Sequence, residues 1–228
     1  MTFRFSVSLL LTFLLAPSVV AAQTAKLPDY KPVIRDTIEQ AIIPAYNQLV
    51  NKASIQQETI RQLCADPEPK NLKSSQTAFF DLLQAWSAAE MYRLGPAQES
   101  NRQEKLFFWP DRKGRGLRQV RKILSGKPAN ALEPETLAGK SVAVQGLTAL
   151  EFTLFAKGSE QELTEKEQSY RCRYALAISG TIKQTARDIL AGWQDEDGYS
   201  SLMLNAGEKN PVYKTDKEII RDLLQKAD

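Results

Sequence analysis

Hydrophobic side chains recur at helical spacing from Lys31 almost to the end of the chain. Between residues 31 and 64 they return every three or four positions, which is typical of one face of an amphipathic helix. Pro44 interrupts this stretch, and we expect it to kink or divide the helix because proline removes a backbone donor and clashes with the preceding turn. The same spacing predicts further helices over residues 72–94, 117–124, 134–156, 164–193 and from Thr215 to Asp228.

Turn and capping residues separate these predicted helices. Proline and glycine mark starts and stops at Gly95-Pro96, Pro134 and Gly158. Thr164 and Thr215 are each followed three residues later by a glutamate, which is the form of a capping box at a helix N-terminus. Residues 97–116 and 195–211 are expected to be irregular. Helices joined by loops of this length, with no β-hairpin signal, predict an all-α fold, an antiparallel helical bundle.

The first 22 residues have the pattern of a secretory signal peptide. Arg4 supplies a positive charge, residues 5–15 form an apolar core, and residues 20–22 offer small side chains for cleavage. The apolar run is shorter than the ~20 residues that a transmembrane helix needs. We therefore expect cleavage after Ala22, no transmembrane anchor in the mature protein, and a helical domain over residues 23–228 located in the periplasm. The alternative is an uncleaved anchor.

Composition limits the classes of function. The chain has 30 Lys and Arg residues against 27 Asp and Glu, and its net charge of +3 falls by one when Arg4 is removed with the leader. This balance is too close to neutral to indicate a nucleic-acid partner. The chain contains no histidine, which excludes imidazole-based triads and zinc sites of the His-Glu-x-x-His type.

The chain has two cysteines, Cys64 and Cys172, and both follow the predicted leader. An even number of cysteines in an exported protein favours a disulfide. The alternative is metal ligation, but two thiols without histidine make a poor metal site. We therefore expect Cys64 and Cys172 to be bonded.

Five segments in a fixed order carry a family resemblance. They are residues 85–86 (Ala-Trp), 93–96 (Arg-Leu-Gly-Pro), 107–111 (Phe-Phe-Trp-Pro-Asp), 146–151 (Gly-Leu-Thr-Ala-Leu-Glu) and 171–174 (Arg-Cys-Arg-Tyr). Together they resemble the imelysin-like family, helical envelope proteins of bacteria whose signature reads Gly-x-His-x-x-Glu. Gly146 and Glu151 match this signature, whereas Thr148 stands at the histidine position.

The resemblance implies a role in the bacterial envelope, often linked to iron acquisition. Members are usually longer, with two helical bundles and a site expected in the groove between them, so this chain corresponds to the first bundle plus part of the second and is short at its C-terminus. Family members were first described as metallopeptidases, an activity that needs strong metal ligands. Thr148 is a poor ligand for zinc or iron, and no residue is therefore assigned to catalysis.

Glu151 is the main candidate for chemistry. Apolar residues at helical spacing surround it, so we expect a core-facing carboxylate, which is costly to bury without a partner. In a structural role it pairs with Arg93 or Arg118. In a functional role it coordinates iron, zinc or calcium, with Gly146 and Thr148 of the signature beside it and further oxygens from Glu90 and Asp111.

Two neighbouring segments add candidate contacts. Trp109-Pro110 displays a large aromatic side chain that either plugs the end of the bundle or lines the groove beside Glu151. Arg93 and Arg118 are further candidates for the groove wall. A basic cluster spans residues 112–122 and either forms a solvated face or contacts an anion or a membrane headgroup.

Three functions follow from these patterns. The first is a non-catalytic periplasmic protein that binds a metal ion, a metal complex or an envelope protein partner. The second is a metallopeptidase of the imelysin type whose metal site is completed by other groups. The third is a structural remnant that has lost its ligand.

Overall fold

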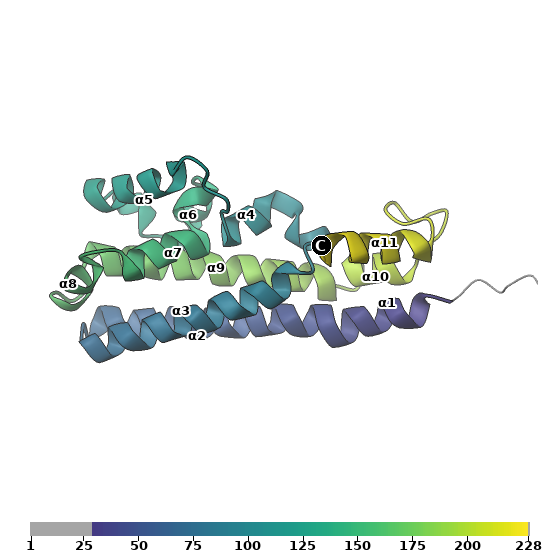
Figure 1. Ribbon diagram of the computed structural model, residues 1–228, viewed down its shortest axis with the longest axis horizontal. Helices are drawn as coiled ribbons and strands as arrows, with labels where there is room; N and C mark the ends of the chain where they lie inside the picture. The colour runs from purple at the N-terminus through teal and green to yellow at the C-terminus, as the bar shows by residue number, and fades with distance from the viewer. Residues whose placement is uncertain (1–28, 228) are drawn as a thin grey trace, which may run out of the picture.

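The computed structural model describes residues 29–227, so the predicted signal peptide lies outside the described residues. Every element in this range is helical, which confirms the all-α prediction. Three long helices run side by side along the molecule (Figure 1): α2 (Ile43–Ala65), α3 (Pro69–Glu90) and α9 (Tyr170–Gln194). Within residues 29–227, no helix combines the length and apolar character needed to cross a membrane.

The predicted disturbance at Pro44 takes the form of a widened helical turn. The first helix, α1 (Lys31–Thr37), passes through the π-helical turn η1 (Ile38–Ile42) directly into α2. Because Pro44 has no N–H and its ring crowds the carbonyl four residues earlier, the ladder of hydrogen bonds is interrupted at this point. The two helical segments continue as one rod in Figure 1.

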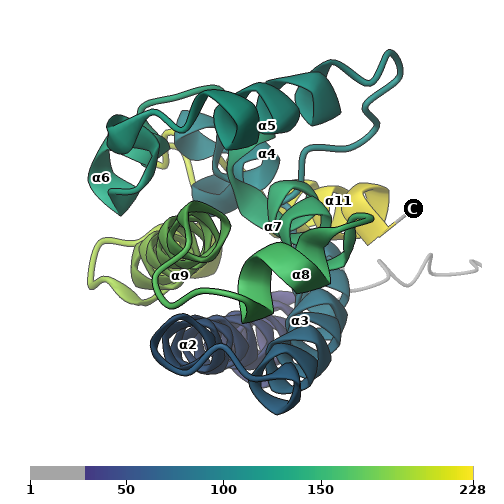
Figure 2. The same ribbon diagram turned by 90° about the vertical axis from the view of Figure 1, so that its left-hand side faces the viewer.

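Shorter helices form a second layer, in which residues 102–138 lie over α9 on the side opposite α2, and residues 146–164 lie beside α9 and also contact α3 (Figure 2). They are α4 (Arg102–Leu106), α5 (Arg115–Gly126), α6 (Pro134–Ala138), α7 (Gly146–Phe155) and α8 (Ser159–Thr164). Single helical turns connect them: η2 (Gly95–Ala97), η3 (Glu99–Asn101), η4 (Ala129–Ala131) and η5 (Val142–Val144). At the other end of the molecule, α10 (Tyr199–Leu204) and α11 (Asp216–Ala227) contact α1.

Two buried tyrosines of the core have their hydroxyl groups anchored inside the protein. Tyr46 of α2 donates its hydroxyl to the Tyr92 carbonyl at 2.9 Å, and Tyr174 of α9 donates to the Val144 carbonyl at 2.5 Å. Both rings are fully buried, and this burial raises the pKa of both phenols well above the usual range. The bond from Tyr174 ties the second layer to α9.

A disulfide joins the end of α2 to the first turn of α9, as predicted. The Cys64 and Cys172 sulfurs are 2.01 Å apart, and their Cα atoms are 5.5 Å apart. Gln168 reinforces this junction, because its backbone N–H and its side-chain amide both donate to the Cys64 carbonyl, at 3.0 and 3.1 Å. The cross-link closes a loop that contains α3 and the whole second layer.

Four predictions about the helices were wrong. The segment 97–116 is not wholly irregular, since it contains α4. The segment 134–156 is two helices, α6 and α7, because Gly146 adopts a left-handed backbone conformation that ends any continuous helix there. Thr164 ends α8 instead of capping α9, and Ser169 caps α9 by accepting a bond from the Cys172 N–H at 3.3 Å. The segment 195–211 is not wholly irregular, since it contains α10.

Candidate functional site

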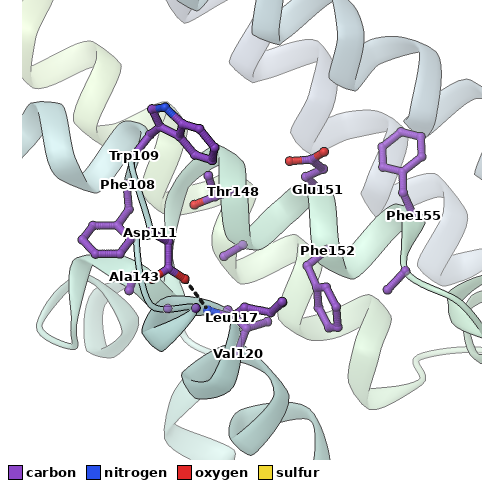
Figure 3. Close-up of a pocket in the computed structure, with 14 residues that line it drawn as sticks. Phe108, Trp109, Asp111, Leu117, Val120, Ala143, Thr148, Glu151, Phe152 and Phe155 are labelled. Carbon is purple, nitrogen blue, oxygen red and sulfur yellow. Dashed lines mark hydrogen bonds between the residues drawn. The ribbon is translucent and has the colours of Figure 1, made fainter.

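A groove of about 460 Å³ lies between α5, α7 and the segment that precedes α5. Its walls are mainly apolar and aromatic, with Asp111, Thr148 and Glu151 as the polar groups that reach it (Figure 3). The lining residues are Phe108, Trp109, Asp111, Gly114, Gly116, Leu117, Val120, Ala143, Thr148, Ala149, Glu151, Phe152, Phe155 and Ala156. An apolar groove with few convergent polar groups is the usual form of a binding site.

Gly146 shapes the groove without lining it. Its φ is +81°, and a Cβ atom at this position would meet the backbone carbonyls of Lys105 and Leu106, the latter at 2.7 Å. Only glycine fits both the left-handed conformation and this close approach. Gly146 therefore lets the end of α4 lie against the start of α7, which sends the following segment, with Phe108 and Trp109, over the groove.

Asp111 organises the segment that forms the groove wall. Its two carboxylate oxygens accept bonds from the Arg115 N–H at 2.8 Å and the Leu117 N–H at 3.2 Å. The bond to Leu117 is drawn in Figure 3. These donors belong to the first turn of α5, where backbone N–H groups have no partner inside the helix. Asp111 thus holds the N-terminus of α5, and this bonding uses both of its oxygens.

Glu151 is exposed, so the prediction that it is a buried, core-facing carboxylate was wrong. The buried stripe of α7 consists of Leu147, Leu150 and Leu154, and Glu151 projects from the helix on a different side (Figure 3). Within residues 29–227, no side chain or backbone group bonds to the Glu151 carboxylate. It is therefore available to a ligand.

The other predicted partners of Glu151 lie elsewhere. Arg93 pairs with Glu90 at 3.6 Å near the end of α3, and the Arg118 guanidinium donates to the Lys113 carbonyl at 2.7 Å. None of these three side chains lines the groove, which differs from the predictions for Arg93, Arg118 and Glu90. Among the described residues, no group of three His, Cys, Asp or Glu side chains is placed to hold a metal ion.

Trp109 lies at the groove rather than in the bundle. Its side chain is 72% exposed, so the alternative that it plugs the bundle end was wrong. The indole stacks on Phe107, with ring centroids 6.5 Å apart, and Phe107 in turn contacts the buried Trp86. This stack fixes Trp109 over one end of the groove, near Thr148 (Figure 3).

The sequence patterns missed an aromatic patch at the other end of the groove. Phe155 contacts Phe79 and Phe80 of α3, each pair with ring centroids 5.4 Å apart. Phe80 is 58% exposed and Phe155 is 36% exposed. The sequence did contain a signal for this patch. Phe79 and Phe80 are consecutive on one helix and cannot both face the core, so one of them had to lie at the surface.

These features define a class of protein: an all-α bundle with one groove that has aromatic walls. Among the described residues that line this groove, Glu151 is the carboxylate without an internal partner, and it belongs to the segment 146–151. The family model described as Imelysin matches residues 42–227. The chain belongs to the imelysin family.

Two solved structures share the fold. An imelysin-like protein from Psychrobacter arcticum 273-4 has a TM-score of 0.71 and 23% identity, over 86% of this chain and 57% of that one. A protein from Parabacteroides distasonis ATCC 8503, provisionally named iron-regulated protein A precursor, has a TM-score of 0.64 and 16% identity, over 79% of this chain and 52% of that one. The chain therefore spans little more than half the length of these relatives. No curated protein matches it.

Proposed function

We propose that this protein is a non-catalytic binding protein of the periplasm, and that its groove receives a cationic, partly apolar segment of an envelope partner. The observation that carries this proposal is the position of Glu151, an exposed carboxylate without an internal partner on a groove with aromatic walls. Trp109 at one end and Phe155 at the other offer apolar contacts, and Glu151 between them offers one negative charge.

The chemistry of the groove favours binding over peptide hydrolysis. Hydrolysis by this family's chemistry requires a metal with an activated water, and Thr148 supplies only a hydroxyl. The second carboxylate on the groove, Asp111, is already bonded to two backbone N–H groups of α5. One free carboxylate next to aromatic rings suits a lysine or arginine flanked by apolar side chains.

The test uses a fluorophore that the chain already carries. Trp86 and Trp193 are buried, so Trp109 is the tryptophan that acrylamide reaches. Residues 23–228 contain every described helix, and this fragment is titrated with a synthetic peptide of alternating lysine and leucine. We expect the peptide to protect Trp109 from quenching and Glu151→Gln to abolish that protection.

Three controls make this result specific. Glu196→Gln removes another exposed carboxylate, one that lies outside the groove, and should leave the protection intact. Trp109→Phe should remove the quenchable signal. A peptide with glutamate in place of lysine should not bind. Protection that persists in Glu151→Gln, or no protection at all, would contradict the proposal.

A metal ion at Glu151 is the second candidate, because Glu151 and Thr148 lie one turn apart on the same exposed side of α7. One structural relative carries a name that links it to iron. Thermal unfolding with iron(II), iron(III), zinc or calcium tests this candidate, since a ligand at a hundred times its Kd stabilises by about 2.7 kcal/mol. A shift that disappears in Glu151→Gln supports metal binding, and no shift with any of the four ions rules it out.

A further inference from the structure

The helix α5 and the residues that flank it carry a strongly basic face beside the groove. Between Asp111 and Glu133 the chain has seven cationic residues and no carboxylate. They are Arg112, Lys113, Arg115, Arg118, Arg121, Lys122 and Lys127, and all seven are exposed. Within residues 29–227, none of them lies within ion-pair distance of a carboxylate.

The two sides of α5 differ in chemistry. Gly116 and Val120 are buried and Leu117, Ile123 and Leu124 are half-buried, so this side packs onto the protein. The exposed side consists of Arg115, Arg118, Gln119, Arg121, Lys122, Ser125 and Gly126. Figures 1 and 2 place α5 at the outer edge of the molecule, on the side away from α2 and α3. Arg115, Arg118 and Lys122 therefore point outward along a helix of 12 residues, about 18 Å long. The guanidinium of Arg121 instead lies over the ring of Phe152, 5.4 Å from its centroid.

The rest of the chain has the opposite charge. Outside this segment there are 23 cationic and 27 acidic residues. Three consecutive acidic residues, Asp195, Glu196 and Asp197, are exposed between α9 and α10, at the end of the molecule away from α5 (Figure 1). A protein polarised in this way turns its basic face toward any extended negative surface, because the remaining surface is repelled.

The residue types on the exposed side of α5 favour anionic lipid over a protein or a nucleic acid as the partner. A protein partner is usually held by apolar or aromatic anchors near the centre of the interface, and the exposed residues of α5 include none. Binding of single-stranded nucleic acid normally uses stacked aromatic rings, and residues 112–132 contain no aromatic side chain. Adsorption to anionic lipid headgroups needs only clustered lysine and arginine.

We propose that the exposed side of α5 docks on a bilayer that contains anionic phospholipids. A hollow of about 470 Å³ beside α5 has a mainly apolar wall that includes Ile123, Pro128 and Val144. Lys122 and Lys140 also line it, so it offers space for the upper part of a lipid next to two ammonium groups. The cations contact the lipid phosphates, and the bound protein lies with α2 and α3 away from the membrane. This docking is independent of any ligand in the groove.

Co-sedimentation of residues 23–228 with phospholipid vesicles tests the proposal. We expect binding to phosphatidylcholine vesicles that contain about one-third phosphatidylglycerol, release at high ionic strength, and no binding to phosphatidylcholine alone. The triple variant Arg115→Gln, Arg118→Gln and Lys122→Gln should weaken binding about 100-fold, since each cation near an anionic surface contributes about fivefold.

The matched control removes the same charge elsewhere. Lys73→Gln, Lys157→Gln and Lys209→Gln change three exposed lysines outside α5, and this variant should bind nearly as tightly as the parent. Equal losses in the two triple variants would overturn the proposal, as would failure of the parent to bind. Binding of the parent to soluble heparin but not to vesicles would overturn it in favour of an acidic macromolecule. Quenching of Trp109 should be the same in both triple variants.

Discussion

The two layers of the molecule hold their shape by different means. The long helices α2, α3 and α9 pack through continuous stripes of buried apolar side chains. The disulfide joins α2 to α9 at one end. The second layer has short helices, and single residues with special geometry fix their positions. Gly146 allows a close backbone contact, Asp111 holds the start of α5, and the buried Gln145 amide donates to the Leu137 and Lys140 carbonyls at 3.3 and 3.2 Å.

This difference explains where the candidate surfaces lie. The long helices bury most of their apolar stripe against each other. The hollow of about 280 Å³ that α9 borders is therefore lined mainly by polar side chains, and none of the described residues that line it is aromatic. The second layer encloses the groove and carries the basic face of α5, because its short elements can be tilted and separated by loops. In this protein the regular layer supplies stability, and the irregular layer supplies the candidate surfaces.

The largest expected loss of stability comes from the cross-link in the regular layer. Cys64→Ala together with Cys172→Ala removes a bond that spans 108 positions, which corresponds to about 4–5 kcal/mol in the chain-entropy treatment. Denaturation in urea should show this loss. The parent protein with reductant should unfold at the same urea concentration as the variant. A variant as stable as the oxidised parent would show that packing alone holds α2 to α9.

A smaller loss is expected from Gly146→Ala in the second layer. Alanine at this position combines left-handed strain with overlap onto the Leu106 carbonyl, and we expect a cost of about 2–3 kcal/mol. Gly158→Ala is the matched control, because Gly158 has φ +84° but nothing within 4 Å of the added Cβ. The control should lose only about 1 kcal/mol. Equal losses would mean that the contact with α4 contributes nothing.

The smallest loss is expected from Asp111→Ala, which frees two N–H groups at the start of α5. Loss of a helix cap of this kind lowers the free energy of unfolding by about 1 kcal/mol. Asp111→Asn keeps one acceptor oxygen and should lose less. Because the loop at residues 107–111 also carries Trp109, the alanine variant should shift the emission of that indole, whereas a spectrum identical to the parent's would show that the loop is held by other contacts.

The sequence predicted the regular layer well because its information is periodic. Stripes of apolar residues specify a long helix, and the two cysteines correctly indicated which ends meet. The second layer depends on contacts that no local pattern encodes. That Gly146 faces the Leu106 carbonyl, 40 positions earlier, is visible only once the chain is folded.

The same limit applies to the candidate site, because local patterns point to its segments but not to the faces that their side chains occupy. The signature segment and the Trp-Pro segment lie beside one groove, and Asp111, Thr148, Glu151 and Trp109 all line it. The burial of Glu151 was predicted wrongly, because an apolar helix of ten residues leaves little contrast between its faces. Leu147, Leu150 and Leu154 are buried, whereas Phe155 faces the groove.

The disulfide also has a topological consequence. Every element that builds the groove, from α3 to α8, lies on the stretch of chain between Cys64 and Cys172. A protease that cuts this stretch once leaves both fragments in one covalent molecule until a reductant is added. The site is therefore carried on a closed ring of polypeptide, and the two arms outside that ring contain α1, α2 and most of α9 with the helices that follow it.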